Sequence, residues 1–90
     1  MKDNVIVYGA DWCGDTVRTL KHLDRLGVEY NYINIDEDSD GEAKVVKWNQ
    51  GKRRIPTLEV ASETSDSIIL SVPSNSDLEI ELKAKGHLKK

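Results

Sequence analysis

Hydrophobic residues follow two different periods along the first half of the chain. Residues 5–8 are continuously apolar and end at Gly9, which is typical of a strand buried on both faces. From residue 16 to residue 26 the apolar positions recur every three residues, and Gly27 follows as a helix terminator. Residues 30–35 are again rich in aromatic and β-branched side chains. The pattern predicts strand, helix and strand, and therefore a parallel pair of strands.

The second half of the chain predicts a helix followed by a hairpin. Ser39-Asp40-Gly41-Glu42 has the form of a capping box, and helical spacing continues after it, so we expect a helix over residues 40–50. Two short β-rich runs, at residues 57–61 and 68–72, flank a polar stretch at residues 62–67. This arrangement is typical of two strands joined by a hairpin connection.

The last segment carries two competing patterns. Ser74 can cap a helix with Asp77 three residues later, Leu78 and Leu82 stand four apart, and Gly86 can end it. The same residues 78–82 also alternate between apolar and acidic side chains, as a strand does. We favour the helix, which gives the order βαβαββα and an α/β layer sandwich with a four-stranded mixed sheet. Residues 87–90 are expected to fray.

The chain has one cysteine, Cys13, and it lies between the first predicted strand and the first predicted helix. A helix N-terminus presents unpaired N–H groups and partial positive charge, which favour the thiolate form of a cysteine. Trp12 directly precedes it, and an aromatic side chain there could cover one side of the thiol while the other side stays open to a bulky sulfur partner. A lone cysteine is elsewhere a small buried hydrophobe, but this position favours a reactive thiol.

Length and composition limit the number of domains, the cellular compartment and the kinds of partner that we expect. We expect residues 1–90 to form one domain, because 90 residues support one modest core. One cysteine excludes an intramolecular disulfide, and no signal-peptide or membrane-spanning pattern is seen, so we expect a cytoplasmic protein without membrane association. A net charge of −3 and a pI near 5.3 argue against nucleic acid as a partner. The acidic residues 36–38 are interpreted as solvated loop charge.

Three short motifs together resemble the glutaredoxin family, and within it the small bacterial and archaeal glutaredoxin-like proteins that include the mycoredoxins. They are Trp12-Cys13-Gly14-Asp15-Thr16, Ile55-Pro56-Thr57 and Pro73-Ser74-Asn75. The resemblance covers nearly the whole chain and implies the glutaredoxin variant of the thioredoxin fold. It also implies that Cys13 is the nucleophile and that the Ile55-Pro56 bond is cis, with the Ile55 backbone turned toward the sulfur.

The resemblance further implies a low-molecular-weight thiol, usually glutathione, as co-substrate, with no tightly bound cofactor and no metal. One carboxylate of this thiol would contact Lys52, Arg53 or Arg54, which form a basic run just before Ile55. Another would contact the backbone N–H groups around Ser74 and Asn75 at the start of the last helix. Arg18 stands at a place that is often basic in the family, and the resemblance implies that it helps to bind this thiol. The glycine pair and acidic pair of many glutaredoxins are not found here, and Val72-Pro73-Ser74-Asn75 stands instead, so glutathione, mycothiol and other thiols remain open.

Residue 16 is threonine where dithiol members have a second cysteine, so the motif supports a monothiol mechanism. Cys13 would attack a mixed disulfide between a client protein and a small thiol, and a second small thiol would free it. The Thr16 hydroxyl could donate a hydrogen bond to the thiolate, or serve simply as a first-turn helix residue. The sequence is also consistent with threonine replacing a native resolving cysteine, in which case the parent protein would be a dithiol reductase.

Two other functions stay open at this stage. A [2Fe-2S] carrier is one, although related carriers have Cys-Gly-Phe-Ser and a lysine nearby, whereas this chain has Asp15 and Asp11 beside Cys13. A redox-silent interaction module is the other, because a fold alone does not establish activity. For the oxidoreductase we expect a monomer whose partners are the small thiol and disulfide-bearing client proteins. His22 and His87 have no sequence neighbours that suggest a metal site.

Overall fold

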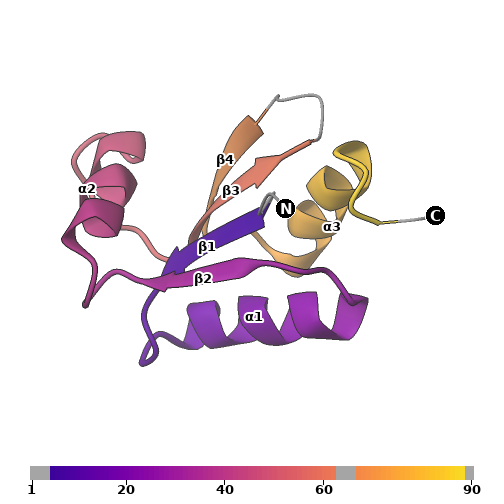
Figure 1. Cartoon of the computed structure of the whole chain (residues 1–90), viewed down its shortest axis with the longest axis horizontal. Coiled ribbons are helices and arrows are strands. Elements are labelled where there is room, and N and C mark those ends of the chain that lie inside the picture. Colours follow the sequence, from indigo (N-terminus) through magenta and orange to yellow (C-terminus); the bar gives the residue numbers. More distant parts are fainter. Residues whose placement is uncertain (1–4, 63–66, 89–90) are drawn as a thin grey trace.

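A four-stranded mixed sheet with helices on both faces forms the body of the computed structural model, which describes residues 5–62 and 67–88 (Figure 1). The element order along the chain is the expected βαβαββα. The elements are β1 (Val5–Gly9), α1 (Gly14–Leu26), β2 (Asn31–Asn34), α2 (Ser39–Trp48), β3 (Thr57–Ala61), β4 (Ser67–Ser71) and α3 (Asn75–Ala84). The predicted α/β fold class is therefore confirmed.

The strands lie in the order β2-β1-β3-β4. β1 pairs in parallel with β2 and antiparallel with β3, and β3 pairs antiparallel with β4. A parallel pair needs a crossover, and α1 provides it. Because β1 is an inner strand, the loop that follows it is flanked by the chain segments next to β2 and β3.

Side chains of β1 alternate between two hydrophobic clusters, one on each face of the sheet. Val5 and Val7 point into the larger cluster, where α1 contributes Leu23 and α3 contributes Leu78 and Leu82. Tyr8 points into the smaller cluster on the other face. The smaller cluster contains Tyr8, Ile35 and Val45, with Ile6, Ile33, Trp48 and Ile55 packed against it. Burial on both faces explains the continuous apolar run in the sequence.

Several predicted boundaries are corrected by the structure. The N-cap of α2 is Asp38 rather than Ser39, because the Asp38 carboxylate accepts a hydrogen bond of 2.9 Å from the Gly41 N–H. Helix α2 ends at Trp48, and Gln50 has a positive φ of 54°. Strand β4 ends at Ser71, because Val72 leaves the extended region with a φ of 46°.

The C-terminal segment does not fray at His87 and Leu88, contrary to expectation. A ring nitrogen of His87 lies 2.7 Å from the carbonyl oxygen of Ala61, and Leu88 packs against the larger cluster. Lys89 and Lys90 lie outside the described residues, as do residues 63–66 of the predicted hairpin connection. Within the described residues, no helix combines the length and apolar character needed to cross a membrane.

The burial of α3 decides between the two patterns seen in its sequence. A strand would place Ile80 on the same face as Leu78 and Leu82, whereas a helix turns it away. Leu78 and Leu82 are 0% exposed, and Ile80 is 63% exposed. The Ser74 side chain caps this helix by accepting a hydrogen bond of 3.1 Å from the Asp77 N–H. The predicted helix and its cap are confirmed.

Replacing Leu78 by alanine should destabilise the protein by about 2–5 kcal/mol, because the substitution leaves a cavity between α3 and the sheet. The matched control, Ile80→Ala on the same helix, should change the free energy of unfolding by about 0.5 kcal/mol or less. Urea denaturation followed by circular dichroism measures both. Equal losses for the two variants would contradict the burial described for this helix.

Candidate functional site

Cys13 occupies the N-cap position of α1, directly after the turn that follows β1. Its backbone is extended, with φ −85° and ψ 119°, and its carbonyl oxygen accepts the first helical hydrogen bond from Val17, at 3.0 Å. Its side chain makes no capping hydrogen bond and is partly exposed. The thiol is therefore accessible, and the N–H groups of the first turn of α1 lie beside it.

The loop before β3 brings Ile55 to the sulfur. Cys13 Sγ lies 3.8 Å from the carbonyl oxygen of Ile55, although the two residues are 42 positions apart. The Ile55-Pro56 peptide bond is cis, as the family resemblance implied. Pro56 is buried, and its carbonyl oxygen accepts a hydrogen bond of 2.8 Å from the Val72 N–H. The Cys13 and Ile-Pro-Thr motifs thus meet in space.

Thr16 is fully buried beneath the Cys13 loop, and its hydroxyl oxygen lies 3.4 Å from the Ala10 N–H, which donates to it. The side chain also packs closely against Gly9, where a Cβ atom would lie 2.5 Å from Thr16 Oγ1. Thr16 therefore fixes the start of α1 against the end of β1. A hydrogen bond from its hydroxyl to the Cys13 thiolate stays a prediction.

Trp12 is 68% exposed, and its ring is held by a polar contact. Its indole Nε1–H donates a hydrogen bond of 2.8 Å to Asp36 Oδ2. Arg53 donates to the other oxygen of Asp36 at 2.5 Å and to Glu42 Oε2 at 2.8 Å. Two predicted site residues, Trp12 and Arg53, are thus joined through a carboxylate. Asp36 and Asp38 are exposed, as the interpretation as solvated loop charge predicted, but both carboxylates also accept hydrogen bonds from the protein.

Tyr32 on β2 holds the residue next to Trp12. Its hydroxyl donates a hydrogen bond of 2.8 Å to Asp11 Oδ1. Burial raises the pKa of Tyr32 well above its ordinary value, and the hydrogen bond to Asp11 and the nearby charges of Asp11 and Asp36 add to this effect. The Asp11 carboxylate next to Cys13 is therefore tied to the sheet by a neutral phenol.

Arg18 connects α1 with the start of α3. It donates a hydrogen bond of 2.6 Å to Asn75 Oδ1 and one of 3.2 Å to the Pro73 carbonyl oxygen. Its Nε also lies 3.5 Å from Asp15 Oδ1. Arg18, Ser74 and Asn75, which were predicted to bind one end of a small thiol, are therefore brought together. The Asp15 carboxylate partly offsets the Arg18 charge.

Val72 turns the chain from β4 into the segment before α3. Its φ of 46° lies in the left-handed region, which a β-branched residue adopts at a cost of roughly 1–3 kcal/mol. The hydrogen bond from the Val72 N–H to Pro56 fixes the turn next to the loop that carries Ile55.

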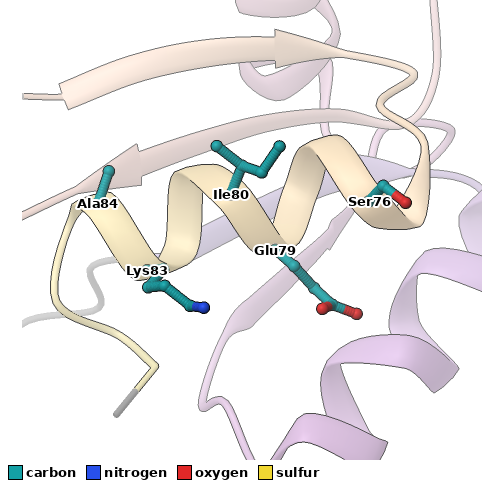
Figure 2. Close-up of a pocket in the computed structure, with 5 residues that line it drawn as sticks. All are labelled: Ser76, Glu79, Ile80, Lys83 and Ala84. Atoms are coloured by element: carbon teal, nitrogen blue, oxygen red, sulfur yellow. The ribbon is translucent and has the colours of Figure 1, made fainter. Parts of the chain in front are cut away.

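Cys13 lines neither of two surface hollows formed by residues that the structure describes. One, of about 360 Å³, is lined by Lys52 and Arg54 of the basic run together with Asn49, Gln50 and Ser71. The other, of about 460 Å³, runs along α3 (Figure 2). Its described lining residues are Ser76, Glu79, Ile80, Lys83 and Ala84. We assign the candidate site to the Cys13 region rather than to the larger hollow, because the sulfur and its neighbouring motifs meet there.

Asp36 and Tyr32 are the two site residues that the sequence analysis missed. A signal for them existed, because the ends of parallel neighbouring strands meet at one edge of a sheet. Asp36 follows β2, and so it lies beside the loop that follows β1. Among the described residues, no group of three or more His, Cys, Asp or Glu side chains could hold a metal ion.

Comparisons with known proteins agree with this geometry. A family model named Glutaredoxin matches residues 5–64. Mycoredoxin 1 from Corynebacterium glutamicum is 38% identical over 61 residues, which cover 68% of this chain and 75% of that protein.

Solved structures are similar over more of the chain. The glutaredoxin–glutathione complex from buckwheat superposes with a TM-score of 0.67 and 25% identity, covering 97% of this chain and 83% of that one. A glutaredoxin from Archaeoglobus fulgidus gives a TM-score of 0.64 at 24% identity, with 87% of this chain and 84% of that one covered. The Archaeoglobus structure supports the fold alone.

Replacing Gly9 by alanine should destabilise the protein by about 1–3 kcal/mol, because the new methyl group would collide with the buried Thr16 side chain. Gly14→Ala is the control, since no other atom lies within 4 Å of a Cβ at that position. It should shift stability by about 1 kcal/mol or less. Urea denaturation distinguishes the two variants, and an unperturbed Gly9→Ala protein would argue against the close contact.

The free energy of unfolding should fall as the pH rises above about 10. Burial is the largest cause of the raised pKa values of Tyr8, Tyr30 and Tyr32, the three tyrosines of the chain. Each phenol therefore keeps its proton longer in the folded state, and that stabilisation is lost as the pH rises through the folded pKa. Chemical denaturation between about pH 9 and pH 11 measures the loss, which should be smaller in Tyr32→Phe. An identical slope in both proteins would contradict the assignment.

Proposed function

Because the chain belongs to the glutaredoxin family, we propose that it reduces mixed disulfides between client proteins and a low-molecular-weight thiol by a monothiol mechanism. The thiol oxidoreductase class follows from the family. The monothiol reduction of mixed disulfides is supported by the position of Cys13. This residue is partly exposed at the N-cap of α1, and its sulfur lies 3.8 Å from the Ile55 carbonyl oxygen. No second cysteine is present in the chain to resolve an intermediate.

In the first step the Cys13 thiolate attacks the sulfur that belongs to the small thiol. A disulfide forms between Cys13 and the small thiol, the original disulfide breaks, and the client leaves as a thiolate that takes up a proton. In the second step another small-thiol thiolate attacks this new disulfide. The Cys13 thiolate is released, and the two small thiols leave joined as a disulfide. Overall, the client–thiol mixed disulfide and one small thiol are converted into a client thiol and a disulfide of two small thiols, so the client sulfur is reduced and the sulfur of the second small thiol is oxidised.

The charges around Cys13 are consistent with a small thiol that carries carboxylates. Among the described residues, Lys52 and Arg54 form no ion pair, so their charges are available to one carboxylate. Arg53 is already paired with two carboxylates. A second carboxylate would contact Arg18 and the first N–H groups of α3, next to Ser74 and Asn75. Free backbone groups of Ile55 would contact the small thiol as a neighbouring strand does.

The buckwheat relative was solved with glutathione, so glutathione is the first thiol to test. Mycothiol is the second, because the similarity to mycoredoxin 1 is the strongest at the sequence level among the relatives described above. We propose a monomeric cytoplasmic protein, since each feature of the proposed site comes from this one chain and a free thiol needs a reducing compartment.

The proposal is tested by turnover of a glutathionylated model disulfide with glutathione, then with mycothiol and other small thiols. We expect at least one thiol to support turnover, and Cys13→Ser to reduce it to the uncatalysed rate. Mass spectrometry should detect a disulfide between Cys13 and that thiol. Ile80→Ala, an exposed change on α3, is the control that should keep activity. Turnover that persists in Cys13→Ser, or is absent with every thiol, would refute the proposal.

A further inference from the structure

Asp36 joins three separate segments of the chain around Cys13. Its carboxylate lies just after β2 and accepts from Trp12 in the loop before α1 and from Arg53 in the loop before β3. The three residues are distant in sequence, with separations of 24 and 17 positions from Asp36. The two bonds go to different oxygens, so one carboxylate satisfies both donors at the same time.

Asp36 is fixed at its backbone as well as at its carboxylate. The Asp36 N–H donates a hydrogen bond of 3.0 Å to Asn34 Oδ1 at the end of β2. At the carboxylate, the planar Arg53 guanidinium is held by Glu42 of α2 as well as by Asp36. The donors also hold Asp36 in its charged form, because the hydrogen bond from Trp12, and then that from Arg53, lower its pKa. A charged carboxylate can only accept hydrogen bonds, as this arrangement requires.

Trp12 needs such a partner because it has little packing. Its side chain is 68% exposed, and it appears in neither hydrophobic cluster of the described residues. An exposed aromatic ring samples several rotamers unless a directed contact selects one. The bond from its indole to Asp36 is the directed contact that the structure provides. Its neighbour Asp11 is held in a similar way by Tyr32, so two consecutive residues before Cys13 are tied to β2 or to the loop that follows it.

We propose that Asp36 is a positioning residue that holds the Trp12 ring beside Cys13. The incoming mixed disulfide would then contact a Trp12 side chain that is already ordered. The expected effect of Asp36 on binding of the mixed disulfide rests on the proposed function. Without Asp36 the ring would have to be ordered on each binding event, and ordering one such side chain costs enough to weaken binding by about two- to tenfold. The chemical steps at Cys13 would be affected less, because Asp36 does not touch the sulfur in the structure.

Two substitutions at Asp36 separate its roles. Asp36→Asn keeps an oxygen that can accept from the indole but removes the charge that pairs with Arg53. Asp36→Ala removes both. Glu37→Gln is the matched control, because it removes one negative charge from the same loop, and the exposed Glu37 side chain forms no hydrogen bond or ion pair among the described residues.

The first measurement is the indole N–H signal of Trp12 in a proton–nitrogen NMR spectrum, assigned with Trp48→Phe because the chain has two tryptophans. A hydrogen bond to a carboxylate shifts this proton downfield and slows its exchange with water. We expect both properties to be lost in Asp36→Ala, largely kept in Asp36→Asn, and unchanged in Glu37→Gln. An indole signal that is the same in Asp36→Ala and in the wild type would overturn the proposal.

The second measurement is the steady-state kinetics of the same variants with a mixed disulfide. We expect KM to rise about two- to tenfold in Asp36→Ala while kcat stays within about twofold, with a smaller rise in Asp36→Asn. A KM for Asp36→Ala equal to that of Glu37→Gln, or equal losses in both Asp36 variants, would refute the positioning role. A wild-type protein with no Cys13-dependent turnover would instead refute the proposed function, while the NMR result would still show whether Asp36 holds Trp12.

Discussion

The pairing of β1 with a strand on each side is the constraint on which the rest of the structure depends. β1 is hydrogen-bonded to β2 and β3, and its side chains are buried on both faces of the sheet. The end of β1 is therefore held by pairing with both neighbouring strands, and Thr16 packs α1 directly against it at Gly9. Cys13 lies between these two fixed points. A mobile surface loop could not hold a sulfur with the same precision.

The surroundings of Cys13 are assembled from loops that follow or precede neighbouring strands. The loop before β3 contributes Ile55, the loop after β2 contributes Asp36, and the turn after β4 leads to Asn75. Polar contacts, rather than packing, join these loops. This division is physically reasonable, because a site that must admit a bulky disulfide cannot be filled with apolar side chains. Hydrogen bonds and ion pairs order the rim and leave it open to water.

The helices and strands, and the position of Cys13 between the first strand and the first helix, could be predicted from the sequence. Periodicity and turn residues are local signals, and they carry this information. The same holds for Ser74, whose capping role depends on Asp77 three positions away. The motifs that resembled a known family also placed Ile55 near Cys13 correctly. By contrast, the contacts of Asp36 and Tyr32 join residues that are 24 and 21 positions apart. No local sequence pattern distinguishes an acidic loop residue that bonds to a distant segment from one that is only solvated. The strand order is needed to show which segments lie beside Asp36.

The bonds that Arg18 already makes have a consequence for any carboxylate that arrives at the start of α3. Such an anion would exchange places with Asn75, the Pro73 carbonyl and Asp15 instead of meeting a vacant cation. The net gain from each contact is therefore modest, because one set of partners replaces another. Under the proposed function, the small thiol leaves Cys13 in every cycle, so weak binding would be an advantage, because tight binding would slow its release.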